Sequence, residues 1–204
     1  MTMVEQVLDL FNFAQGRRHF LRGSLAVAGS LALVNSRELG RAFAQTLADE
    51  DILQFALTLE HLEARMYADM LATNLLAGKE LQYFTSFGQH EAAHVDALTT
   101  TLRSLGAEPV AAQATYNFPA FDSRDAILTF AKTAEDIGVG AYQGAAAAIT
   151  NKEILAAAGS IVQVEARHAA IVNLLLGLKP VPNAVTASLT IEEVTAQVGP
   201  ILGS

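Results

Sequence analysis

Two histidines of this chain each stand three residues after a glutamate, as Glu91 with His94 and Glu165 with His168. Both pairs fall in segments with the composition of helices, where positions i and i+3 lie on one face. Each pair therefore directs a carboxylate and an imidazole toward the same point. Carboxylate and imidazole together form a ligand set that iron and manganese accept.

Two further glutamates, Glu60 and Glu135, lie in the helical segments that precede these pairs. Each is followed seven residues later by a tyrosine, as Tyr67 and Tyr142. The pattern thus occurs twice, with 75 residues between the single glutamates, and this repetition predicts a pseudo-twofold axis through the site. Two helical turns from the glutamates, the tyrosines can donate hydrogen bonds to ligand carboxylates or serve as ordinary core residues.

Four glutamates within apolar helices need compensating charge, because a buried carboxylate without a partner is very costly. Ion pairs with lysine or arginine are the alternative, but only Lys132 and Arg167 lie within one helical turn of any of the four. Two divalent ions balance four carboxylates and leave the two imidazoles to complete the ligand set. The sequence therefore predicts two ions of iron or manganese inside a helix bundle.

The six predicted ligands divide into bridging and terminal residues. Glu91 and Glu165 bridge the two ions in this prediction. The terminal ligands form two sets, Glu60 with His94 and Glu135 with His168.

Three other residues near these positions are weaker candidates. Glu63 lies one turn from Glu60 and can replace it, but it has no tyrosine seven residues later and no counterpart in the third helical segment. His61 and His90 are each adjacent to a predicted ligand and hence rotated by about 100° from it on a helix. We expect both histidines to lie outside the site.

The apolar spacing predicts four long helices over about 49–76, 80–105, 123–149 and 152–176, with short turns near 77–79 and 150–151. The connection 107–122 is long enough to run the length of the bundle, because sixteen extended residues span up to roughly 50 Å. Two antiparallel helix pairs joined by one long crossover form the ferritin-like variant of a four-helix bundle. Thr190 and Glu193 have capping-box spacing, which predicts a short C-terminal helix from Ile191.

The first 44 residues have the features of an export leader. Arg17 and Arg18 precede an apolar run over 23–34, as in a twin-arginine signal, and Ala42 and Ala44 have the spacing of a signal-peptidase site. A chance arginine pair before an amphipathic helix is the alternative. We expect a leader over 1–44, a bundle over 45–180 and a tail over 181–204, with export to the periplasm or cell envelope, or secretion. An uncleaved leader would be the only membrane attachment.

Composition excludes several classes of site and partner. The chain has no cysteine, so neither a disulfide framework nor a thiolate metal site is available, and iron or manganese is favoured over structural zinc. The net charge is −8. Without residues 1–44, which hold five basic and three acidic residues, it becomes −10. No basic stripe remains to attract nucleic acid, which we exclude as a partner.

Three stretches of the chain resemble a known family: FALTLEHLEA at 55–64, HEAAHV at 90–95 and AEDIGVGAY at 134–142. They are similar to the ferritin-like superfamily of carboxylate-bridged di-metal proteins, and within it to the exported ferritin-like domain family that includes desiccation-related proteins. The resemblance covers residues 49–178 and implies a di-iron or di-manganese centre with the six ligands above. One departure is Val164, where di-iron oxygenases often carry an aspartate before the last Glu-x-Arg-His.

The resemblance implies a redox-active protein that oxidises Fe(II) or consumes peroxide in oxidative-stress defence. The alternative is a non-enzymatic stress or desiccation protectant that the metal ions stabilise, and the sequence does not decide whether the chain is an enzyme. A ferritin-type storage cage is disfavoured, because the tail gives no sign of a long fifth helix. Dioxygen or peroxide is the expected small-molecule partner, and a homodimer stays open.

Overall fold

The computed structural model describes residues 48–203 of the chain, and every regular element within them is a helix. The predicted leader, with Arg17 and Arg18, lies outside the described residues. The helices are α4 (Asp49–Ala72), α5 (Gly78–Ser104), α6 (Arg124–Ala146), α7 (Lys152–Leu175) and α8 (Ile191–Leu202).

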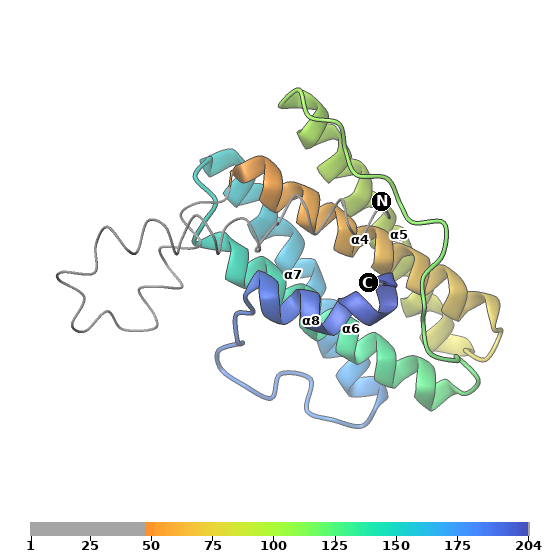
Figure 1. Ribbon diagram of the computed structural model, residues 1–204. Coiled ribbons are helices and arrows are strands. Elements are labelled where there is room, and N and C mark those ends of the chain that lie inside the picture. The colour runs from red at the N-terminus through yellow and green to blue at the C-terminus, as the bar shows by residue number, and fades with distance from the viewer. Residues whose placement is uncertain (1–47, 204) are drawn as a thin grey trace, which may run out of the picture.

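Four of these helices form a bundle of two antiparallel pairs (Figure 1). α4 packs along α5 and α6 packs along α7, while contacts of α4 with α6 and of α5 with α7 join the pairs. The connection between α5 and α6 runs along the outside of the bundle from one end to the other. The ferritin-like four-helix bundle with one long crossover and a short C-terminal helix is therefore confirmed.

Local signals set most of the helix boundaries where the sequence places them. Ser123 begins α6 by accepting a hydrogen bond from the Ala126 amide at 3.2 Å, and Asn151 begins α7 in the same way. α4 ends at Ala72, four residues before the predicted end, because Asn74 adopts a left-handed backbone with φ of 58°. α6 likewise ends three residues early, at Ala146.

The start of α4 is fastened to the turn between α6 and α7. The Asp49 carboxylate accepts hydrogen bonds from the backbone amides of Thr150 and Asn151, both at 2.8 Å, and from the Thr150 hydroxyl at 3.0 Å. Burial opposes ionisation of Asp49, but these hydrogen bonds leave its pKa below the ordinary value. The contact fixes the height of one helix pair relative to the other.

Apolar residues fill the bundle on both sides of a polar layer. One cluster, which includes Leu57, Leu98 and Ile154, fills the end near the α6–α7 turn. A second, which includes Met66 and Phe84, fills the opposite end. Between them, each of the four helices contributes at least one buried ionisable residue.

The tail crosses α6 so closely that only glycine fits beneath it. The Leu189 amide donates to the Gly140 carbonyl at 2.9 Å, and a Cβ at Gly144 would lie 1.8 Å from the Leu189 carbonyl oxygen. α8 then begins with the predicted capping box, in which the Thr190 hydroxyl accepts from the Glu193 amide at 3.2 Å. Val194 and Val198 of α8 are buried in a third apolar cluster against α4 and α6.

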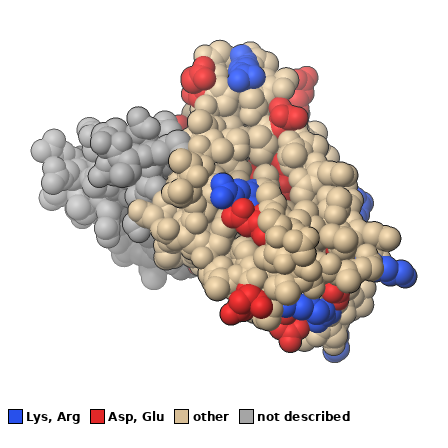
Figure 2. All heavy atoms as spheres, turned by 90° about the vertical axis from the view of Figure 1, so that its right-hand side faces the viewer, with Lys and Arg blue, Asp and Glu red and all other residues tan. Residues whose placement is uncertain are grey.

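The surface in Figure 2 carries basic and acidic side chains interspersed, with no basic stripe on the face drawn. No helix among residues 48–203 combines the length and the apolar character that crossing a membrane requires.

Candidate metal centre

The structure brings the six predicted ligands together in the polar layer, from all four bundle helices. Each is at most 8 % exposed, and the four glutamates are completely buried. The residues are Glu60 from α4, Glu91 and His94 from α5, Glu135 from α6, and Glu165 and His168 from α7.

Each histidine points its Nδ1 atom at carboxylate oxygens. His94 Nδ1 lies 3.1 Å from Glu60 Oε2, 3.0 Å from Glu91 Oε2 and 3.2 Å from Glu165 Oε1. One imidazole nitrogen carries at most one proton and so cannot donate to three acceptors at once. His168 Nδ1 lies 3.0 Å from Glu91 Oε1 and 3.4 Å from Glu135 Oε2, and neither contact is aligned as a hydrogen bond.

The side chains form two groups of four that can each hold a metal ion. In both groups one ligand atom per residue lies within 4.8 Å of those of the other three. Glu91 and Glu165 belong to both groups, which places them where bridging ligands must lie. Glu60 and His94 complete one group, and Glu135 and His168 complete the other.

The protein alone does not satisfy this cluster. Five buried atoms of the site have no hydrogen-bond partner among the described residues: Glu91 Oε1, Glu135 Oε2, both carboxylate oxygens of Glu165, and His168 Nδ1. Lys132 pairs with the exposed Asp136 at 2.5 Å, and no lysine or arginine of residues 48–203 pairs with a site carboxylate. Orphaned oxygen and nitrogen atoms in this number fit two divalent ions.

The two tyrosines cross between the halves of the site. Tyr67 of α4 donates its hydroxyl hydrogen bond to Glu135 Oε1 of α6. Tyr142 of α6 donates to Glu60 Oε1 of α4 at 2.5 Å. Each tyrosine therefore orients the glutamate of the opposite half, and each is also part of an apolar cluster.

Burial dominates the acid–base behaviour of the carboxylates. It raises the pKa of Glu60 and of Glu165 to about 8, although the nearby His94 imidazole acts in the opposite direction. Burial alone would lower the pKa of His94, but its hydrogen bonds with carboxylates raise it to about 12. The protein without metal therefore holds protons in this layer, and metal ions must displace them.

Glu63 is a fifth carboxylate in the layer, beside Glu60 rather than in its place. It is 4 % exposed, and burial together with repulsion from the other glutamates raises its pKa well above the ordinary value. A Cβ at Gly138 would lie 3.1 Å from Glu63 Oε1 and 3.3 Å from Glu165 Oε2. The 75-residue offset that relates Glu60 to Glu135 also relates Glu63 to Gly138. The sequence therefore carried a signal: the position equivalent to Glu63 is a glycine, which has no side chain and leaves space for the Glu63 carboxylate.

His90 was predicted to lie outside the site, and it belongs to neither four-residue group, but it contacts one of the two histidines that do. Its Nδ1 atom lies 2.9 Å from Nε2 of His168, and the two rings stack with centroids 5.2 Å apart. His90 is rotated away from the ligand face of α5, but this rotation turns it toward α7. The contact is made at Nε2, on the opposite edge of the His168 ring from Nδ1, which faces the carboxylates. It therefore holds the ring in place from behind.

The contact of His90 is also relevant to Val164, the position at which di-iron oxygenases often carry an aspartate. The two positions are equivalent in the repeat, since each immediately precedes a Glu-x-x-His. One histidine of the site thus has a hydrogen-bonding neighbour from this position. The other predicted outlier, His61, contacts the Val110 carbonyl at 3.2 Å, away from the six ligands.

Comparison with known proteins agrees with this fold. Among solved structures, a conserved hypothetical protein, rv2844, from Mycobacterium tuberculosis has the same fold, with a TM-score of 0.59 and 20% sequence identity over 71% of this chain and 99% of that chain. A search of the curated proteins finds no significant match. The sequence profile of the ferritin-like domain matches residues 48–178, which is more than half of the chain. The four-helix bundle with its buried glutamate and histidine layer is thus that of a member of the ferritin-like domain family.

Proposed function

We propose that this protein binds two ions of iron or manganese and uses them in metal oxidation or in the removal of peroxide. The observation that carries the proposal is the set of orphaned oxygen and nitrogen atoms shared between two four-residue groups. A cluster of this composition, closed on both sides by apolar residues, suits a pair of hard divalent ions.

When bound, two metal ions that each give up one electron supply the two electrons that, with two protons, reduce one hydrogen peroxide to two waters. The chain positions this chemistry. Tyr67 and Tyr142 hold the terminal carboxylates by hydrogen bonds, and His90 holds the His168 ring. No lysine or arginine of residues 48–203 pairs with Glu91 or Glu165, so these two carboxylates can shift as the ions change charge.

Export is the second part of the proposal and rests on the sequence of residues 1–44. A twin-arginine route carries folded proteins, which suits a protein that acquires its metal ions before crossing the membrane. We place the protein in the periplasm or cell envelope, with a role in the response to oxidative stress or desiccation.

Metal analysis of protein purified from its native compartment tests the metal assignment. We expect two ions of iron or manganese per chain, and their loss in the Glu165→Ala/His168→Ala variant. The matched control, Glu192→Ala/His61→Ala, removes the same residue types outside the site and should keep both ions. Metal-loaded wild-type protein that neither oxidises Fe(II) nor consumes peroxide faster than buffer would rule out the redox role.

One observation favours a structural role as the alternative. Five buried carboxylates repel one another in the core, so metal ions should stabilise the bundle whatever their chemistry. A protectant would show a large fall in melting temperature on chelation together with no turnover. An unchanged melting temperature in Glu91→Ala protein would exclude a structural metal.

A further inference from the structure

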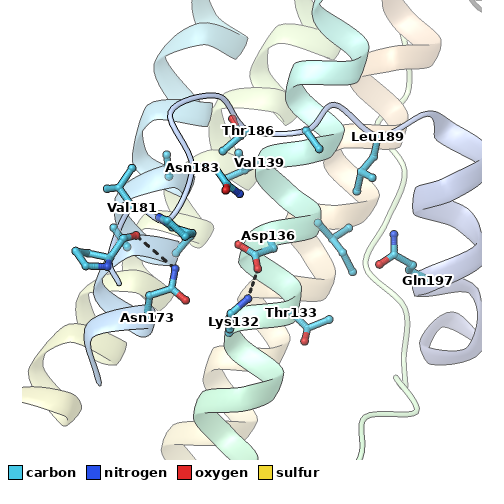
Figure 3. A pocket seen from close by; sticks show the side chains of 17 residues that line it. Lys132, Thr133, Asp136, Val139, Asn173, Val181, Asn183, Thr186, Leu189 and Gln197 are labelled. Atoms are coloured by element: carbon cyan, nitrogen blue, oxygen red, sulfur yellow. Dashed lines mark hydrogen bonds and ion pairs between the residues drawn. The ribbon is translucent and has the colours of Figure 1, made fainter. Parts of the chain in front are cut away.

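Two adjoining cavities lie beside the polar layer that holds the six predicted ligands. The function proposed above does not use them. The outer cavity, of about 550 Å³, opens between α6, α7 and the segment that follows α7 (Figure 3). Its wall includes the ion pair of Lys132 with Asp136 and the hydrogen bond from the Asn173 side chain to the Pro180 carbonyl. The outer cavity is open to solvent-borne molecules.

The inner cavity, of about 220 Å³, lies beneath α8 between α4 and α6. It shares Thr133, Ile137 and Gln197 with the outer cavity, so the two meet at these side chains. Most of its wall is aliphatic or aromatic, and Glu63 and Gly138 also line it. The inner cavity therefore connects the outer cavity with the polar layer.

Glu63 and Gly138 mark the point where the inner cavity reaches the site. The space in which a side chain at position 138 would stand is 3.1 Å from Glu63 Oε1 and 3.3 Å from Glu165 Oε2. Hydrogen bonds reach Glu60 and Glu135 from tyrosines. Within residues 48–203 no hydrogen bond or ion pair engages the Glu63 carboxylate, which is 96 % buried. A free acceptor thus faces a mainly apolar chamber.

We infer that these cavities are the entry route and binding chamber for hydrogen peroxide, an inference that rests on the function proposed above. An anion would have to leave water for apolar walls beside the Glu63 carboxylate, which is costly. A hydrated metal cation would have to shed water against apolar walls, which is costly. Hydrogen peroxide is small and uncharged, and its O–H group can donate to Glu63, whereas dioxygen has no donor. Glu63 then positions the molecule at the flank of Glu165.

A bulky side chain at the junction of the two cavities tests the route. Gln197 is exposed on α8, so Gln197→Phe adds a ring at the junction without disturbing a packed core. The matched control is Ala196→Phe, at a neighbouring exposed position that lines neither cavity. With both variants loaded with metal, we expect peroxide-driven oxidation to slow about tenfold in Gln197→Phe, equivalent to about 1.4 kcal/mol. The control should react like wild type.

A second measurement does not depend on turnover. Apolar cavities bind xenon, so crystals of the full chain under xenon pressure should show a xenon atom between α4, α6 and α8. No xenon there would overturn the inference, as would equal peroxide rates in the two variants while wild type reacts. Slower metal uptake in Gln197→Phe, with peroxide oxidation unchanged, would likewise overturn it, as would slowing of the dioxygen reaction alone. Wild-type protein that binds two ions but is inert to peroxide would instead overturn the proposed redox function itself.

Discussion

The two histidines of the site are not equivalent, although the repeat in the sequence makes them look so. His168 stacks on His90 and lies with its ring centroid 4.1 Å from that of Phe87. His94 has carboxylates on its Nδ1 side, and its equivalent of His90 in the repeat is Val164. The two metal positions should therefore differ in affinity, because neighbours that orient a ligand histidine strengthen metal binding.

The first prediction is that His90→Leu weakens one metal position. Loss of the contact at His168 Nε2 frees the ring, and the affinity for one of the two ions should fall about tenfold or more. Titration with Co(II), followed by its absorption, would resolve the two binding steps. The matched control is His61→Leu, which removes an imidazole away from the ligands. Two unchanged affinities in His90→Leu would contradict the prediction.

The second prediction concerns Gly138. Alanine there suits a helix interior better than glycine by about 1 kcal/mol, but its Cβ would crowd Glu63 Oε1 at 3.1 Å. The carboxylate is the end of a flexible side chain and can move. We therefore expect Gly138→Ala to keep the metal-free protein folded and no less stable, while the Co(II) spectrum changes because Glu63 and the adjacent Glu165 carboxylate are displaced. An unchanged spectrum would show that neither carboxylate is displaced enough to affect the ions.

At the scale of elements, the tail depends on two glycines of α6. Gly140 and Gly144 lie one turn apart and form the bed over which Leu189 passes. The crossing brings α8 onto α4 and α6, where Val198 and Ile201 close the inner cavity. The two glycines of α6 thus allow α8 to cover the inner cavity.

The third prediction is that Gly144→Ala releases the tail. The added methyl group would lie 1.8 Å from the Leu189 carbonyl oxygen, and a backbone atom cannot move aside as a side chain can. We expect a loss of stability on the order of 1–3 kcal/mol and faster hydrogen exchange in α8. Gly159→Ala in α7 is the control, since a methyl group there meets no atom within 4 Å. It should be neutral or stabilising, by up to about 1 kcal/mol.

At the scale of the whole molecule, the fourth prediction is that the metal-free protein loses stability as the pH rises. Burial raises the pKa of Glu60 and Glu165 from the ordinary 4.5 to about 8. Burial opposes protonation of His168, but contacts with carboxylates raise its pKa to about 10. Groups whose pKa is raised by folding stabilise the protein at low pH, and this contribution is lost as the pH passes the folded-state value.

Urea denaturation with a chelator present should therefore give a lower midpoint at pH 8.5 than at pH 6. Glu91 acts in the opposite sense, because its neighbouring histidines overcome burial and lower its pKa to about 2. Its contribution is lost only below pH 4.5, outside this window. Added Mn(II) should restore the midpoint most at pH 8.5, where fewer protons compete for the ligands. A midpoint that rises with pH in the chelated protein would contradict the assignment.

Spacing within one helix allowed most of the site to be anticipated. The i, i+3 pairs and the 75-residue repeat located the six ligand candidates, and turn residues located the bundle and its crossover. Glu63 was undervalued because no side chain repeats it in α6: its counterpart is Gly138, which leaves empty space instead. The contact of His90 with His168 was not anticipated, because rotation about one helix does not tell what the neighbouring helix presents.

The crossed tyrosine hydrogen bonds have a consequence for assembly. The bundle consists of two helical hairpins, α4 with α5 and α6 with α7. In both hydrogen bonds the tyrosine and the glutamate come from different hairpins. Both four-residue groups also take residues from both hairpins. A fragment with only one hairpin carries three residues of one four-residue group, one residue of the other group, and one partner of each tyrosine–carboxylate hydrogen bond. Metal capture thus reports that the two hairpins have docked, and a chain split in the crossover should bind its ions only when the fragments are mixed.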